Sequence, residues 1–211
     1  MSKHIITIGR AYGSGGRLIG CEVAEKLGYT FYDKELIELA AKECGFSTDF
    51  IKANEQRATF GFFANLASQG FSYSKDTLPP ADMLFVAQCK VIQDIAAKED
   101  CVIVGRCADY VLRNMPNVLN VFIHSDMESK VRRVVEDYGV ESDNVVELIN
   151  KTDKRRANYY NYYTGMKWGR AENYHLALRT DCLGIDGAVD TLVHFIEARN
   201  AEMERAEAET E

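Results

Sequence analysis

Short, β-branched apolar runs alternate along the chain with longer stretches in which apolar residues recur every three or four positions. A short apolar run bounded by turn residues is typical of a buried strand, and the longer period is typical of an amphipathic helix. The runs predict strands over residues 4–9, 28–33, 101–106, 117–125 and 174–182. The longer stretches predict helices over residues 15–27, 34–45, 48–57, 81–100, 126–139, 143–165 and 184–200.

The alternation of strands and helices at these lengths predicts an α/β fold with a mostly parallel sheet and helices on both faces. We expect a single domain over residues 1–200, followed by an acidic C-terminal tail over 201–211 that frays. Two segments interrupt the alternation, at about 46–80 and about 140–170. They are the only candidates for insertions into the domain.

Composition and charge narrow the range of partners and compartments. The net charge of −7 over 211 residues argues against a nucleic-acid-binding protein. The N-terminal apolar run is too short for a signal peptide, and no apolar run is long enough to span a membrane. The six cysteines are scattered without a C-x-x-C pair, which favours reduced thiols in a cytoplasmic protein. The four histidines show no metal-ligand spacing, so no metal-binding residue is predicted.

A glycine-rich loop follows the first predicted strand in "GRAYGSGGRLIG" (9–20) and leads into the first helix. Glycines between a strand and a helix let backbone N–H groups converge on a phosphate beside the helix N-terminus. The loop residues Gly13, Ser14, Gly15 and Gly16 are therefore candidate phosphate ligands. The usual lysine of G-x-x-x-x-G-K-[ST] is absent, and Arg17 stands nearby as a cation that could grip phosphate. The alternative is that Arg17 is an ordinary helix-surface arginine.

A dinucleotide-binding loop is the main rival interpretation of these glycines. It requires G-x-G-x-x-G and an acidic residue about 20 positions further on. Gly13, Gly15 and Gly20 miss that spacing by one or two residues, although Asp33 lies where the acid is expected. The loop alone leaves this rival open.

Other charged residues stand where ligands of parallel sheets bind, at the carboxyl ends of strands. Asp33 ends the second predicted strand and could bind substrate or cap the next helix. Arg106 follows a buried strand directly, a position that suits a cation only if it meets an anion or a carboxylate. Further along, "DKRRANYYNYY" combines Asp153, Arg155 and Arg156 with four tyrosines. That basic cluster indicates either a phosphate-binding lid or a solvated helix face.

The blocks "ITIGRAYGSGGRLIG", "VIVGRCADYVL", "DKRRANYYNYYTGMKWG" and "LRTDCLGIDGAVDTLVHFI" resemble, in this order, the cytidylate kinases and especially the cytidylate-kinase-like group. The resemblance implies a P-loop NTPase-type parallel sheet flanked by helices. It also implies a helical acceptor-binding insertion at about 46–80 and a lid at about 140–170. Aligned without gaps, the family's loop lysine falls on Gly16 here, and a one-residue shift places Arg17 at the lysine position. The Asp after the family's Gly-Arg pair is replaced by Cys107. Asp109, two residues on, is the candidate substitute.

This resemblance implies an ATP-dependent, Mg²⁺-assisted phosphoryl transfer to a nucleoside monophosphate, with CMP or a related pyrimidine nucleotide as the expected acceptor. Arg17 and the loop would hold ATP, and Asp33, Arg106, Asp109 and Asp153 would bind the acceptor. Arg155 and Arg156 would stabilise charge on the transferring group. The second hypothesis is a nucleotide-binding sensor or partner module with little or no turnover, which the missing lysine favours. The expected partner is a small nucleotide, without nucleic acid or membrane, and the sequence predicts no oligomeric state.

Overall fold

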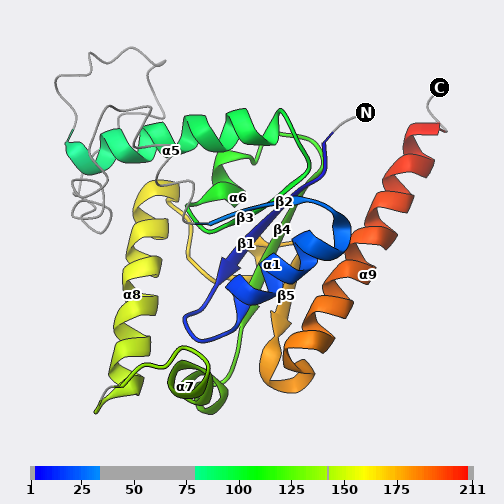
Figure 1. Ribbon diagram of the computed structural model, residues 1–211. Helices are drawn as coiled ribbons and strands as arrows, with labels where there is room; N and C mark the ends of the chain where they lie inside the picture. Colours follow the sequence, from blue (N-terminus) through cyan, green and yellow to red (C-terminus); the bar gives the residue numbers. More distant parts are fainter. Residues whose placement is uncertain (1–2, 34–78, 142, 209–211) are drawn as a thin grey trace.

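The computed structural model describes residues 3–33, 79–141 and 143–208, and within them the chain forms one sheet of five parallel strands. The strand order is β2-β3-β1-β4-β5 (Figure 1). The strands are β1 (Ile5–Arg10), β2 (Thr30–Tyr32), β3 (Cys101–Val104), β4 (Val118–His124) and β5 (Leu176–Arg179). Four of them fall inside the predicted runs, and β1 extends one residue beyond its run, to Arg10. The predicted helices at 34–45 and 48–57, and the 46–80 insertion up to residue 78, lie outside the described residues.

Helices cover both faces of this sheet (Figure 1). They are α1 (Gly16–Leu27), α5 (Pro80–Ala96), α6 (Ala108–Val111), α7 (Met127–Glu136), α8 (Val145–Thr164) and α9 (Thr180–Ala208), with a 3₁₀ turn η2 (Ala171–Asn173). α1 and α9 lie on one face, and α5 and α6 lie on the other. The predicted α/β fold is confirmed.

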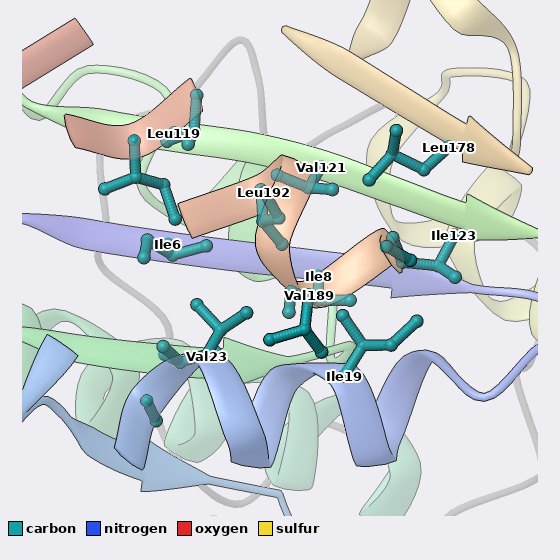
Figure 2. Packing of buried hydrophobic residues seen from close by; sticks show 14 of the residues in the cluster. Ile6, Ile8, Ile19, Val23, Leu119, Val121, Ile123, Leu178, Val189 and Leu192 are labelled. Atoms are coloured by element: carbon teal, nitrogen blue, oxygen red, sulfur yellow. The ribbon is translucent and has the colours of Figure 1, made fainter. Parts of the chain in front are cut away.

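Two separate hydrophobic cores follow from the period-two alternation of the strands. Ile5 of β1 packs into the core beneath α5 and α6. Ile6 and Ile8 face the opposite core, together with Ile19 of α1 and Val189 of α9 (Figure 2). Because both faces are covered, every strand position of the inner strand β3 is buried, as expected for a parallel sheet.

A third, aromatic cluster holds α8 against α5. The rings of Phe85 and Tyr163 stack with their centroids 3.9 Å apart, and the Tyr163 hydroxyl donates to Asp82 at 2.9 Å. Tyr160 is also buried in this cluster. The tyrosines of the "RRANYYNYY" stretch therefore anchor the C-terminal half of α8.

Asp126 caps α7 by accepting from the Ser129 N–H at 2.8 Å. The ends of α9 depart from the sequence-based boundaries. α9 includes a non-helical Gly184 and continues to Ala208. The helix thus runs past residue 200, where the sequence placed the start of the 201–211 tail. In the described ranges, no helix is long and apolar enough to cross a membrane.

Candidate functional site

A cavity of about 390 Å³ opens at the carboxyl ends of β1 and β3, beside α8. Its volume suits a small-molecule ligand. Four arginines line it: Arg10 ends β1, Arg106 follows β3, and Arg155 and Arg156 project from α8. The remaining lining is partly aromatic, with Tyr159, Tyr160, Trp168 and Tyr174.

Two arginines lie close to the carboxylate of Asp33 at the edge of the cavity. Asp33 lies 3.6 Å from Arg10 (Nη2 to Oδ1) and 2.7 Å from Arg17 (Nε to Oδ2). Burial, and then the charge of Arg156, lower the pKa of Arg10 to about 9, whereas Asp33 raises it. The single carboxylate of Asp33 does not balance the charges of the guanidinium groups around it. This part of the cavity therefore favours the binding of a further anion.

The turn after β3 presents Arg106 in an uncommon backbone conformation. Gly105, Arg106 and Cys107 have φ values of 78°, 57° and 55°. Two of these are non-glycine residues in the left-handed region, a conformation that costs free energy and clusters at ligand-binding sites. The turn directs the chain from β3 into α6 while keeping Arg106 on the cavity wall.

Asp109 lies in the aromatic part of the cavity. It accepts a hydrogen bond from the Tyr160 hydroxyl at 2.7 Å. Burial raises the pKa of Asp109, and the Tyr160 hydrogen bond opposes that shift. Asp109 therefore offers a partly buried carboxyl group to a polar edge of a ligand in the cavity.

The glycine loop is closely covered by neighbouring elements. Gly13, Ser14, Gly15 and Gly16 are all buried. Arg133 of α7 donates to the carbonyl of Gly13 at 2.6 Å, and Thr180 donates to the carbonyl of Ser14 at 2.9 Å. The Ser14 hydroxyl donates to the Ala11 carbonyl at 2.8 Å. The loop is thus held from α7 and from the start of α9.

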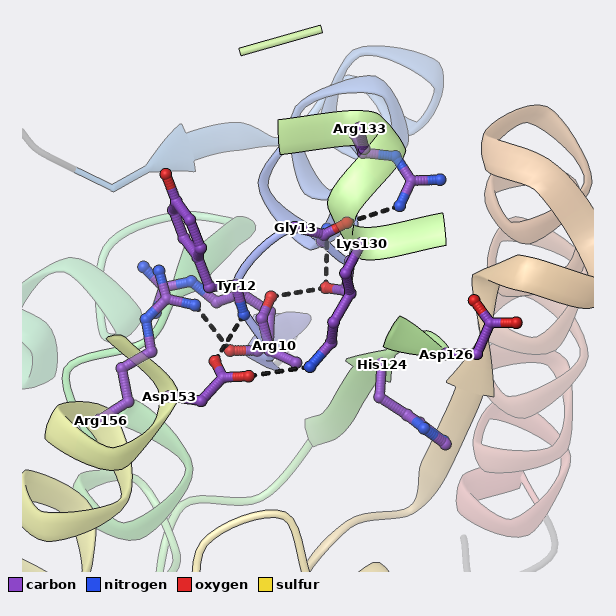
Figure 3. A network of polar contacts seen from close by, with 12 residues as sticks. Arg10, Tyr12, Gly13, His124, Asp126, Lys130, Arg133, Asp153 and Arg156 are labelled. Atoms are coloured by element: carbon purple, nitrogen blue, oxygen red, sulfur yellow. Dashed lines mark hydrogen bonds and ion pairs between the residues drawn. The ribbon is translucent and has the colours of Figure 1, made fainter. Parts of the chain in front are cut away.

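Asp153 links this loop to α8 and α7 (Figure 3). It accepts from the Tyr12 N–H at 2.6 Å and from Lys130 Nζ at 2.8 Å. Arg156 donates to the backbone carbonyl of Arg10 at 2.9 Å. Through these contacts α8 is joined to Arg10, at the end of β1, and to Tyr12, just before the glycines.

The predicted site residues separate into two groups in the structure. Arg106, Asp109, Arg155 and Arg156 line one cavity, and Asp33 pairs with a fifth lining residue, Arg10. The second group is not in the lining of this cavity: it comprises Gly13, Ser14, Gly15, Gly16, Arg17 and Asp153. Their predicted roles in binding stay predictions.

Arg17 is turned away from the loop and towards β2. Its side chain is 56% exposed, its Nε is bonded to Asp33, and its guanidinium lies 5.8 Å from the Phe31 ring centroid. Arg17 therefore pairs with Asp33, the residue that the sequence predicted to bind the acceptor.

Three cations that lie near the loop are absent from the sequence-based predictions: Arg10, Lys130 and Arg133. For Arg10 a signal was present, because it ends a buried apolar run just as Arg106 does. Lys130 and Arg133 lie on α7, far from the loop along the chain, and the sequence pattern does not show that α7 folds over it.

The family profile of the cytidylate kinase-like family matches residues 5–182. Among solved structures, an uncharacterized protein from Eubacterium ventriosum is similar at 28% identity and a TM-score of 0.70, over 92% of this chain and 99% of that one. Shikimate kinase from Bacteroides thetaiotaomicron aligns at 15% identity and a TM-score of 0.54, covering 92% and 98% of the two chains. A gluconokinase from Sinorhizobium meliloti aligns at 17% identity and 0.52, covering 94% and 97%. No curated protein matches the chain.

The parallel sheet, the glycine loop before α1 and these neighbours define a P-loop kinase-like fold. The chain belongs to the cytidylate kinase-like family. The dinucleotide-binding alternative does not fit, because β1 pairs with β3 and β4 here and not with β2, its neighbour in the dinucleotide-binding order.

Proposed function

We propose that this protein transfers the γ-phosphoryl group of ATP to a nucleoside monophosphate, with CMP or a related pyrimidine nucleotide as the first candidate. The observation that carries the proposal is the mixed lining of the cavity. Arg10, Arg106, Arg155 and Arg156 supply positive charge suited to phosphate, and aromatic side chains with Asp109 supply surface suited to a polar ring. A nucleoside monophosphate has this distribution of charge and aromatic surface.

The residues of the cavity have distinct roles in this proposal. Arg106 binds the acceptor phosphate and Asp33 helps to orient the acceptor, whose phosphate oxygen attacks the γ-phosphorus while ADP leaves. Asp109 contacts the nucleoside. Arg155 and Arg156 stabilise the charge that spreads over the transferring group, since phosphoryl transfer depends on positioning and on positive charge. Asp153 contributes by holding α8 to the loop through Tyr12 and Lys130.

ATP and Mg²⁺ are the cofactors of this proposal. Closely placed arginines fit a polyphosphate, and the glycine loop lies directly before the N-terminus of α1. Among the described residues, no group of three or more His, Cys, Asp or Glu side chains could hold a metal. Mg²⁺ is therefore expected to be held chiefly by phosphate oxygens and water, where it offsets the charge of the phosphates.

A cytoplasmic site of action belongs to the same proposal. Cys21, Cys89, Cys101, Cys107 and Cys182 are free thiols in the structure, which suits a reducing compartment.

The test is a panel of nucleoside monophosphates incubated with ATP and Mg²⁺, read by formation of the diphosphate. We expect turnover with a pyrimidine monophosphate and its loss in Arg106→Met, with Arg170→Met, an exposed arginine of the 3₁₀ turn region, as the matched control. Nucleotide binding without product from any acceptor would favour the alternative of a sensor or partner module.

A further inference from the structure

The position that carries the phosphate-binding lysine in related loops is Gly16 in this chain, and the structure shows what fills the space there. A Cβ atom at position 16 would lie 2.6 Å from Cβ and 3.3 Å from Cγ of Arg10. Both distances are shorter than ordinary carbon–carbon contacts. The stem of Arg10 thus crosses the N-terminus of α1 where a side chain of residue 16 would begin.

The guanidinium of Arg10 extends from there to the end of β3. A Cβ atom at position 105 would overlap Nη1 of Arg10 and lie 3.0 Å from its Cζ. Gly105 therefore leaves room for the guanidinium as Gly16 leaves room for the stem. The side chain of Arg10 is only 21% exposed, and it lines the cavity together with Arg106, Arg155 and Arg156.

Arg10 and Arg17 differ in what they face. The carboxylate of Asp33 lies 3.6 Å from Arg10 but 2.7 Å from Arg17, so Arg17 holds the closer ion pair. Arg17 is 56% exposed and does not belong to the lining of the described cavity. Of the two loop-flanking arginines, Arg10 is the one whose guanidinium is both enclosed and directed at the cavity.

We propose that Arg10 takes over the role of the missing loop lysine: it binds the phosphoryl group as it passes between the nucleotide loop and the acceptor at Arg106. Its side chain starts beside Gly16, the first residue of α1, and its guanidinium lies over Gly105, next to Arg106. A planar guanidinium can bind two phosphate oxygens at once, which a lysine cannot do. The catalytic part of this inference rests on the proposed function, whereas phosphate binding by Arg10 does not.

The first experiment measures binding of ATP with Mg²⁺, and of inorganic pyrophosphate, by calorimetry. Arg10→Met keeps an unbranched stem over Gly16 and removes the charge. We expect at least a tenfold weaker binding of both ligands to Arg10→Met, and a smaller change in Arg17→Met. Arg170→Met is the exposed control and should bind as the wild type does.

The second experiment moves the cation back to the family's position. Gly16→Lys alone should fold poorly, because its Cβ meets Arg10. Arg10→Gly combined with Gly16→Lys removes that contact, and it should recover at least tenfold of the affinity that Arg10→Gly loses. Melting temperatures identify variants that fail to fold. If the double variant fails to fold, the binding measurement on Arg10→Met decides whether Arg10 binds phosphate.

The outcomes separate the two proposals. If Arg10→Met binds ATP and pyrophosphate as tightly as the wild type, or if a folded double variant recovers no affinity, the role of Arg10 is refuted while phosphoryl transfer can still stand. If Arg10→Met loses binding but no acceptor gives a product with the wild type, Arg10 is a phosphate ligand in a protein without the proposed activity.

Discussion

At the scale of single residues, electrostatics constrains the cavity, because a cation at the end of a buried strand needs an anionic partner. Arg106 follows β3 and Arg10 ends β1, so both meet this condition. The sequence prediction named Arg106 but placed the phosphate-binding cation after the glycines, at Arg17. Only the structure shows that Arg17 turns to Asp33 and that Arg10 crosses Gly16, because the direction of a side chain is not encoded in sequence spacing.

Asp109 gives a prediction at this scale, since burial raises its pKa above the ordinary value of 3.8. Below that value the carboxyl is protonated in both the folded and the unfolded chain. As the pH rises through the folded-state pKa, the folded protein must ionise a buried group and its free energy of unfolding falls. The amide introduced by Asp109→Asn does not ionise, so the variant lacks this loss of stability. Its oxygen can still accept the hydrogen bond from the Tyr160 hydroxyl.

Melting temperatures of the wild type and Asp109→Asn, measured from pH 3.5 to pH 7, test this expectation. The variant should gain stability relative to the wild type as the pH rises. Asp190→Asn, which changes an exposed carboxylate, should show no such gain. A difference between the wild type and Asp109→Asn that stays constant with pH would mean that Asp109 titrates normally.

At the scale of elements, α8 combines a firmly anchored half with a pair of arginines that line the cavity. The sequence showed its length, its basic cluster and its tyrosines, and suggested a lid over 140–170. It did not show that the tyrosines face α5, because their partners Phe85 and Asp82 precede them by more than seventy residues. The lid over 140–170 stays a prediction, and in the structure the C-terminal half of α8 packs against α5.

Arg155 and Arg156 are therefore expected to differ when each is changed to alanine. Arg155 is exposed, so its removal should change stability by less than about 1 kcal/mol. Arg156 donates to the Arg10 carbonyl, so its removal should cost about 1–3 kcal/mol. Each change should lower turnover, by about 10³-fold if the residue stabilises the transferring group. Steady-state kinetics and denaturant unfolding of the two variants check this, and unchanged turnover in both would exclude a catalytic role for α8.

At the scale of the whole molecule, the alternation of apolar runs was sufficient to predict the parallel α/β sheet and all five strands. The order of those strands was not predictable, because all five runs are similarly apolar and pairing depends on contacts distant in sequence. The cavity was likewise only partly predictable. Its arginines come from β1, the end of β3 and α8, and only the fold brings these three together.

The charge of the whole molecule provides the last prediction. With a net charge of −7 the protein repels anions in general, so any stabilisation by an anion has to come from a local site. Pyrophosphate at about 100 times its Kd should add about 2.7 kcal/mol to the free energy of unfolding, if it binds only the folded protein. For a domain of this size that corresponds to a rise in melting temperature of about 5–11 °C. The comparison is with sodium chloride at equal ionic strength, and with Arg106→Met, in which the rise should shrink. An equal rise in Arg106→Met and the wild type would place the bound anion outside the arginine-lined cavity.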